Sequence, residues 1–227
     1  MTQLALFEVR DLLTKDAIDI SEYCAESIRN IYGLSIDFNI ADYAGLTTQE
    51  TAEAALTANG VSKEEAEEKL PRLMEDLFYT YYNVAGHGKQ LVTDGAAELL
   101  KELKAKGVAI GIATGEIEKV ARFRLEKAGL SEYFSFGAFG NEARDAKDIV
   151  RLALEKARAG LGSDGGAMIV CNSPSFVVAA KDNGIKSAGV ALGHFAKESL
   201  LGAGADVAVE SLKDRDRILK LVTSSHG

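Results

Sequence analysis

Cysteine, proline and positive charge are all scarce in this chain of 227 residues. Its two cysteines, Cys24 and Cys171, lie far apart and have no metal-ligand spacing, which argues against a disulfide framework and against a zinc module. With only two prolines, the chain has no proline-rich linker, and it shows no internal repeat or low-complexity tract. We therefore expect a reduced, cytoplasmic environment.

Long apolar runs are also missing, and we expect no secretory leader. No stretch approaches the ~20 apolar residues that span a membrane, and the N-terminus lacks a basic region followed by an apolar segment and a cleavage site. Lysine and arginine number 26 against 34 acidic residues, a formal charge of −8. This balance argues against nucleic acid and anionic membranes as partners.

What remains is the composition of a soluble globular protein, with 47% hydrophobic and 26% charged residues. The length fits one domain with a sizeable insertion, or two small domains. From residue 94 onward, helical and strand patterns alternate. Strands are expected at 4–7, 108–113, 134–139, 167–170, 187–192 and 206–209, and helices at 95–106, 116–129, 145–159 and from Pro174.

Residues 14–88 instead form an expected all-helical segment. Asp16 to Tyr32 forms the first expected helix, and two further helices should begin at the capping-box patterns Thr47-x-x-Glu50 and Ser62-x-x-Glu65. Pro71 predicts a kink or a break in the last of these helices, because proline lacks a backbone donor. Later in the chain, Asp94 and Ser173 are candidate caps for the helices that follow them.

Strands that alternate with helices favour a parallel sheet with helices on both faces. We predict an α/β, Rossmann-like core formed by residues 1–13 and 89–227, with residues 14–88 as an inserted all-helical cap. In such sheets, ligands bind beyond the C-terminal ends of the strands. The strand ends of interest are residues 8–11, 114–115 and 171–173.

The first strand end suggests a family. The run LALF stops at Glu8, Arg10 and Asp11, and later segments read GIATGEIEKVARFRLEKAGL and MIVCNSPSFVVAAKDNGIKSAGVALG. In order and spacing, this resembles the haloacid dehalogenase-like hydrolase superfamily, with phosphoglycolate phosphatase-type members the nearest match. The resemblance implies a nucleophilic aspartate and an acid/base aspartate in the first motif, and Glu8 and Arg10 occupy these two positions.

The other three motifs of the family are matched to different degrees in this sequence. Thr114 fits the hydroxyl residue of the second motif, although a helix N-cap explains it equally well. Arg144 or Lys147 would supply the cation of the third motif, and a solvated helix face is the alternative for both. The fourth motif implies magnesium-binding acids, but the matching positions are Asn172 and Phe176.

These replacements predict that the family's magnesium site is lost and that no other cofactor takes its place. Magnesium is held mainly by carboxylates together with phosphate and water. An arginine about 4 Å away would repel it by roughly 8 kcal/mol at an effective dielectric near 20. Arg10 also stays protonated and cannot act as an acid and base. A glutamate would place its attacking oxygen about one methylene too far forward.

Two functions follow as alternatives. In the first, the chain is a pseudophosphatase, in which Glu8 with Arg10, or Arg10 with Asp11, forms an ion pair. Its crevice would bind a small anionic or phosphorylated ligand, or a protein partner such as a second copy of the chain. In the second, Glu8 acts with Thr114 and Lys147 as a phosphatase for a small phosphorylated metabolite. The candidate ligand-binding residues are Asp11, Thr114, Gly115, Arg144, Asn172 and Ser173.

Cysteine and histidine add little to these candidates. Cys171 follows a strand and precedes a helix start, so a reactive thiol is conceivable, but burial as a small apolar residue is favoured. His87 and His194 lie in glycine-flanked loops with no partner at ligand spacing. We interpret both histidines as ordinary loop residues.

Overall fold

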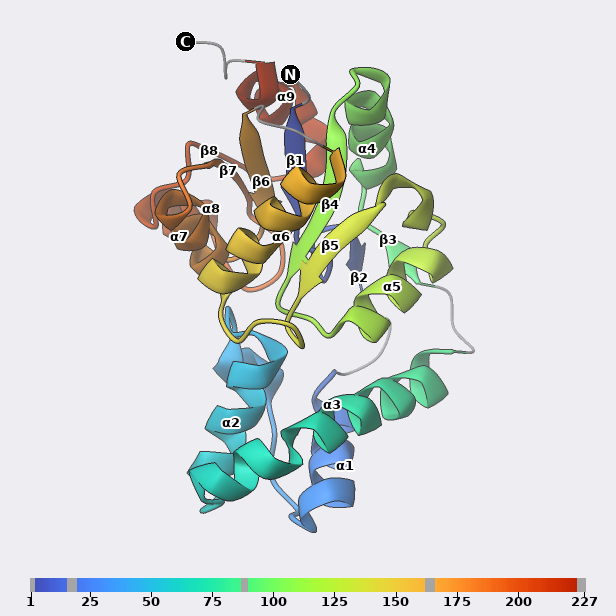
Figure 1. Cartoon of the computed structure of the whole chain (residues 1–227), viewed down its shortest axis with the longest axis vertical. Helices are drawn as coiled ribbons and strands as arrows, with labels where there is room; N and C mark the ends of the chain where they lie inside the picture. Colours follow the sequence, from blue (N-terminus) through green and yellow to red (C-terminus); the bar gives the residue numbers. More distant parts are fainter. Residues whose placement is uncertain (1–2, 16–19, 87–89, 162–165, 224–227) are drawn as a thin grey trace.

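Strand β1 (Leu4–Phe7) lies in the middle of a six-stranded sheet in the computed structural model, which describes residues 3–15, 20–86, 90–161 and 166–223 (Figure 1). The strand order is β5-β4-β1-β6-β7-β8, and every neighbouring pair is parallel. The other strands are β4 (Ala109–Thr114), β5 (Phe136–Phe139), β6 (Ala167–Cys171), β7 (Lys186–Val190) and β8 (Val207–Val209). The predicted Rossmann-like α/β sheet is confirmed.

Helices cover both faces of this sheet (Figure 1). Ala5 and Phe7 of β1 belong to a core cluster with residues of α4, α5 and α9, whereas Leu4 and Leu6 point to a second cluster with α6, α7 and α8. All four residues are buried, as expected for a central parallel strand. The helices are α4 (Ala96–Ala105), α5 (Glu118–Lys127), α6 (Ala146–Leu161), α7 (Pro174–Asp182), α8 (Lys197–Gly202) and α9 (Arg215–Thr223), with short 3-10 turns η2 (Ser131–Tyr133) and η3 (Leu212–Asp214).

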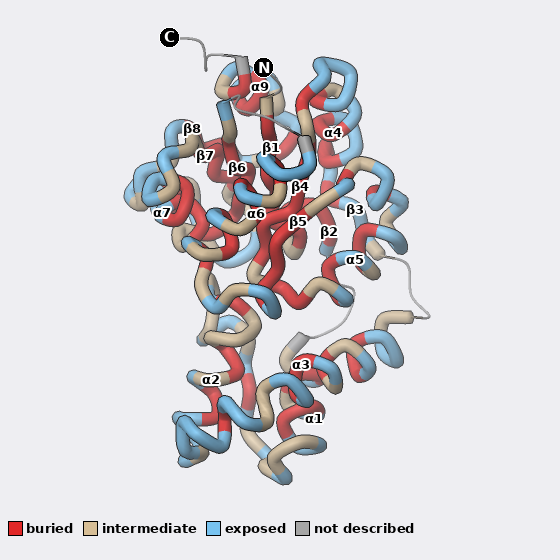
Figure 2. Tube along the Cα trace, in the orientation of Figure 1, coloured by how far each residue is buried: buried red, intermediate tan, exposed pale blue. Residues whose placement is uncertain are grey.

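A separate helical lobe lies beyond the C-terminal ends of the strands (Figure 1). It consists of α1 (Ile20–Tyr32), the 3-10 turn η1 (Ile40–Tyr43), α2 (Thr48–Ala58) and α3 (Lys63–Ala85). These helices have a core of their own, built around Tyr23, Leu56, Leu73 and Tyr81, and the red segments of Figure 2 mark it. The predicted helix start at Asp16 lies outside the described residues.

The two predicted helix starts of the lobe, at Thr47 and Ser62, are confirmed. The Thr47 hydroxyl accepts from the Glu50 amide at 3.2 Å, and the Glu50 carboxylate accepts from the Thr47 amide at 2.9 Å, which completes a capping box. Ser62 caps α3 by accepting from the Glu65 amide at 3.1 Å. Helix α3 continues through Pro71, so of the two predicted alternatives the break is wrong, and the kink stays a prediction. Burial of the turns that follow Pro71 against the lobe core outweighs the roughly 3 kcal/mol that an internal proline costs.

Two further findings concern the connections. Asp94 does not cap α4, because Gly95 occupies the N-cap position and the Asp94 carboxylate pairs with Lys213 at 2.6 Å. The two chain crossings between core and lobe form a small antiparallel pair, β2 (Thr14–Lys15) with β3 (Leu91–Val92). Two-residue strands are too short to produce a readable alternation, so they could not be predicted from the sequence. None of the described helices is long and apolar enough to cross a membrane.

Candidate functional site

The C-terminal ends of β4, β1 and β6 open into a crevice beneath the helical lobe. Because β1 lies between β4 and β6, the sheet brings Glu8, Thr114 and Asn172 together from distant parts of the chain. The crevice holds about 1100 Å³ of empty space, part of it open to solvent. Seven of the sequence-derived candidates line it: Glu8, Arg10, Asp11, Thr114, Gly115, Asn172 and Ser173.

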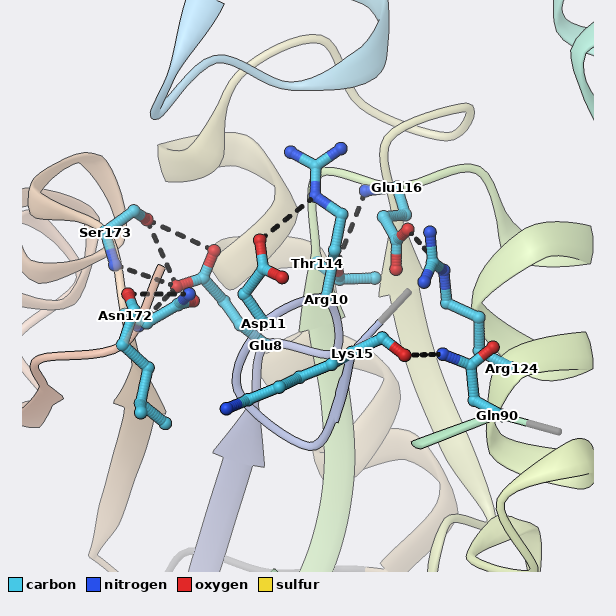
Figure 3. Close-up of polar contacts among 11 residues, drawn as sticks. Glu8, Arg10, Asp11, Lys15, Gln90, Thr114, Glu116, Arg124, Asn172 and Ser173 are labelled. Carbon is cyan, nitrogen blue, oxygen red and sulfur yellow. Dashed lines mark hydrogen bonds and ion pairs between the residues drawn. The ribbon is translucent and has the colours of Figure 1, made fainter. Parts of the chain in front are cut away.

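The Glu8 carboxylate is held by the turn between β6 and α7 (Figure 3). Its Oε2 atom accepts from the backbone amides of Asn172 at 2.8 Å and Ser173 at 3.2 Å. The Ser173 hydroxyl lies 3.1 Å from both carboxylate oxygens. In Figure 3 the carboxylate is turned toward Ser173, away from Arg10 and Thr114. The residue at the nucleophile position is therefore anchored to the neighbouring strand end.

Burial dominates the titration of Glu8. It raises the pKa of the carboxyl from 4.5 to about 7, although the amides of Asn172 and Ser173, the Ser173 hydroxyl and the charge of Arg10 all lower it. Desolvation disfavours the ionised form more than these donors favour it. The pKa of Glu8 therefore lies well above that of an ordinary glutamate, near neutral pH.

Ser173 occupies the predicted cap position but uses its side chain differently. It is the N-cap residue of α7, with Pro174 in the first turn, yet its hydroxyl makes no capping hydrogen bond. The hydroxyl instead contacts Glu8 and lies 3.3 Å from the Ser175 hydroxyl, which in turn donates to the Gly45 carbonyl at 2.7 Å. A chain of hydroxyl groups thus connects Glu8 to the helical lobe.

Arg10 pairs with Asp11, which is the second of the two predicted ion pairs. The Arg10 Nε atom lies 3.9 Å from the Asp11 Oδ2 atom, a long separation for a charge-assisted contact. Glu8 makes its contacts with Asn172 and Ser173 instead. Asp11 has a φ of 61°, in the left-handed region that few residues other than glycine adopt, and its amide donates to the Thr14 carbonyl at 2.8 Å.

Thr114 ends β4 inside the crevice and is buried. Its hydroxyl accepts from the Glu116 amide at 3.4 Å, which closes the turn after the strand. The N-cap position of α5 belongs to Ile117, so the alternative interpretation of Thr114 as a helix N-cap is wrong. The turn places the Thr114 side chain beside the crevice instead of at the helix end.

The third-motif candidates lie outside the residues that line the crevice. Arg144 forms an ion pair with Glu53 of the lobe. Lys147 is 63% exposed in its side chain and lies 3.6 Å from Asp182 on the outer face of α6 and α7. Both side chains pair with carboxylates that do not line the crevice.

Sequence reasoning missed a buried ion pair at the edge of the crevice. Glu116, which lines the crevice, pairs with Arg124 of α5 at 2.8 Å, and the Arg124 side chain is fully buried. The Arg124 guanidinium also lies 4.8 Å from the centre of the Tyr81 ring in the lobe. An eight-residue separation between two charges carries no signal of contact in a sequence. His194 also lines the crevice, which its glycine-flanked loop did not indicate.

The remaining candidates are resolved simply. Burial raises the pKa of the Cys171 thiol well above its ordinary value, so this side chain is an apolar core residue rather than a reactive thiol. Cys24 is buried in the lobe and contributes to the crevice wall. His87 lies outside the described residues.

The side chains around the crevice do not fit the magnesium ion that the resemblance implies. The Asn172 amide nitrogen donates to the Leu192 carbonyl at 3.4 Å, and Phe176 packs in the core of the sheet instead of offering an oxygen. Arg10 places a permanent positive charge beside the same strand end. Within the described ranges, no three histidine, cysteine or acidic residues are grouped to hold a metal.

The helical lobe is docked directly onto these strand ends. The Thr48 amide donates to the Gly115 carbonyl at 2.9 Å, and the Thr47 hydroxyl donates to the Arg144 carbonyl at 2.6 Å. A side chain at Gly115 would bring its Cβ within 2.9 Å of the Thr47 Cα atom. Glycine is therefore required at Gly115 for this close approach.

Comparison with known sequences gives a consistent family. The profile described as "Haloacid dehalogenase-like hydrolase" matches residues 15–190, so the match begins after the strand end that carries Glu8 and Arg10. The phosphoglycolate phosphatase of Vibrio parahaemolyticus is 23% identical over 93% of both chains. That of Escherichia coli K12 is 28% identical over 66% of this chain and 59% of its own length.

Solved structures agree with this result at the level of the fold. A predicted phosphatase from Clostridium acetobutylicum superimposes with a TM-score of 0.75 at 22% identity, covering 97% of this chain and 99% of its own. A hydrolase from Pseudomonas syringae gives a TM-score of 0.74 at 19% identity, with coverage of 96% and 97%. The chain belongs to the haloacid dehalogenase-like hydrolase family.

Proposed function

We propose that this chain is a non-hydrolytic member of its family, a pseudophosphatase that binds a small anionic ligand in the crevice. The observation that carries the proposal is the state of Glu8. Its carboxylate is anchored by Asn172 and Ser173 and buried. A nucleophile must be ionised and must aim an oxygen in line at the phosphorus atom, and Glu8 is poorly suited on both counts.

The neighbouring charges support the same proposal. Arg10 occupies the position at which the family places its acid and base, and a guanidinium does not exchange protons near neutral pH. Lys147, the candidate for neutralising a transferred phosphoryl group, pairs with Asp182 outside the crevice. Without these groups, little remains to lower the barrier for phosphoryl transfer.

Anion binding is supported by the groups that do face the crevice. Arg10 offers a planar guanidinium that suits carboxylate and phosphate oxygens, and Thr114 offers a hydroxyl nearby. Asp11 lies opposite, but its 3.9 Å contact leaves room for a competing anion to pair with Arg10 more closely. Protonation of Glu8 near pH 7 further reduces the repulsion that an incoming anion meets.

Turnover and binding assays test this proposal together. The full chain should release no phosphate above blank from a panel of phosphate monoesters that includes 2-phosphoglycolate, with magnesium added. Calorimetry should detect binding of phosphate or a phosphate monoester at millimolar concentration, and Arg10→Gln should remove it. Hydrolysis that Glu8→Gln abolishes would instead establish the alternative function, a phosphatase with Glu8 as its nucleophile. An absence of binding heat from all these anions would refute the ligand-binding function.

A further inference from the structure

The crevice has two chemically different walls. Every charged side chain that lines it comes from the strand ends and loops of the α/β core, including Glu8, Arg10, Asp11 and Glu116. The helical lobe contributes no charged side chain to the lining among its described residues, 20–85. Its wall is largely apolar: beside Tyr23, the large members are Ile28, Phe38, Ile40, Leu46, Leu73 and Leu77.

The apolar wall is continuous with the core of the lobe. Ile28, Phe38, Leu73 and Leu77 are buried members of the lobe cluster. Ile117 and Val120, which follow β4 in the α/β core, join the same cluster and also line the crevice. The apolar surface therefore extends from the lobe down to the turn after Thr114, close to the charged strand ends.

Arg10 marks the polar end of this space. Within the described part of the chain, its only ion pair is the 3.9 Å contact between Nε and Asp11. In Figure 3 the two terminal nitrogens of the guanidinium point away from Asp11 and toward the lobe. The Arg10 side chain is 25% exposed, so a ligand can reach these nitrogens.

We infer that the ligand is an amphipathic anion, with a carboxylate or phosphate head at Arg10 and an apolar body against the lobe. The inference rests on the anion-binding function proposed above and specifies its ligand. A guanidinium binds either head group through two parallel hydrogen bonds. A short, doubly charged or hydroxyl-rich body would leave polar atoms without partners against Phe38 and Leu77, which opposes binding.

Calorimetry with two matched ligand series tests the inference on the full chain. One series compares ethyl phosphate with hexyl phosphate, and the other compares acetate with hexanoate. Each buried methylene is worth about fourfold in affinity. We expect the six-carbon member to bind at least tenfold more tightly than the two-carbon member, and hexyl phosphate to bind at least tenfold more tightly than 2-phosphoglycolate. The series with the larger absolute affinity identifies the head group.

Variants of two leucines with similar exposed fractions test whether the lobe wall causes the dependence of affinity on the length of the apolar body. Leu46 lines the crevice and is 41% exposed, whereas Leu201 of α8 is 47% exposed and lies outside the crevice lining. Leu46→Ser should lower the affinity for hexyl phosphate about threefold to tenfold and leave that for ethyl phosphate unchanged. Leu201→Ser should change neither affinity. Arg10→Gln should weaken every member of the two series.

The outcomes separate this inference from the proposed function. Equal affinities within each series, or tighter binding of 2-phosphoglycolate, would overturn the amphipathic ligand while the anion site stands. If no member of either series binds, the anion-binding function fails and the inference fails with it. If the chain hydrolyses alkyl phosphates, the non-hydrolytic proposal fails, and a tenfold preference for hexyl over ethyl phosphate in kcat/KM would still support the apolar body.

Discussion

At the scale of single residues, Glu8 determines how the strand end behaves. The protonation state of Glu8 decides whether the Ser173 hydroxyl donates to Glu8 or to Ser175. When Glu8 is ionised, the Ser173 hydroxyl donates to it. When Glu8 is protonated, it can donate to Ser173, which then donates to Ser175, while Ser175 donates to Gly45. The protonated form therefore completes the hydrogen-bond chain to the lobe.

The raised pKa of Glu8 predicts a stability that falls as the pH rises. Between pH 4.5 and about 7, the folded chain keeps a proton that the unfolded chain has released. This contribution is fully present below pH 4.5 and is lost as the pH rises through about 7. Its size is about 3 kcal/mol. Denaturant titrations of wild type and Glu8→Gln at pH 5 and pH 8 measure this effect. The free energy of unfolding of the wild type should fall from pH 5 to pH 8, and the fall should be smaller by about this amount in the variant.

Glu155→Gln is the matched control, because Glu155 is an exposed carboxylate paired with Arg151 on the surface of α6. The free energy of unfolding of Glu155→Gln, measured against pH, should parallel that of the wild type to within about 0.5 kcal/mol. Parallel curves for Glu8→Gln and wild type would show that Glu8 titrates at an ordinary pKa and is better solvated than its burial implies.

At the scale of elements, the N-terminus of α2 serves both as a helix start and as a docking point. The Thr47 hydroxyl accepts from Glu50 and donates to the Arg144 carbonyl of the α/β core. Thr47→Ala should cost about 1–2 kcal/mol of unfolding free energy, and it should speed hydrogen exchange at the Thr48 amide, which bonds Gly115. Hydrogen exchange followed by mass spectrometry, together with denaturant titration, measures both effects.

Ser62→Ala provides the comparison, because Ser62 caps α3 with the same chemistry, and its contact with the Glu65 amide lies within the lobe. It should cost about 1 kcal/mol or less and leave exchange at Thr48 unchanged. Equal exchange at Thr48 in both variants would show that the Thr47 to Arg144 contact does not hold the lobe in place.

Local rules account for how well each element could be predicted. Short apolar runs and capping signals identified the strands of the sheet and the starts of α2 and α3, because these depend on neighbours in sequence. The use of Ser173 could not be read in this way. Its position before Pro174 indicated a cap, but a carboxylate delivered by β1 competes for the hydroxyl. Pro71 illustrates the same limit, since tertiary packing outweighs a local breaker.

At the scale of the whole molecule, the parallel sheet explains which site residues were predictable. Strand ends that the family fold places side by side, such as Glu8 and Asn172, were expected to meet and do line one crevice. Contacts between the core and the lobe could not be predicted, because they depend on how these two parts of the chain pack against each other. Arg124 is the main example, with Glu116 on one side and Tyr81 of the lobe on the other.

This docking predicts a strong energetic coupling across the buried Glu116 and Arg124 pair. Arg124→Met leaves the Glu116 carboxylate buried beside an apolar side chain and should cost about 3–5 kcal/mol of unfolding free energy. Glu116→Leu should be costly for the same reason. The double variant removes both charges, so its cost should be at least about 2 kcal/mol smaller than the sum of the single variants.

Loss of Arg124 should also loosen the lobe, because its guanidinium lies over the Tyr81 ring of α3. Denaturant titration of the four proteins gives the coupling, and hydrogen exchange in α3 reports on docking. Lys119→Ala serves as control, since Lys119 joins the core to Glu75 of the lobe through an exposed contact of 3.6 Å. It should change stability by less than about 1 kcal/mol. Additive single variants, with exchange in α3 unchanged by Arg124→Met, would show that the contacts of Arg124 do not hold the lobe on the core.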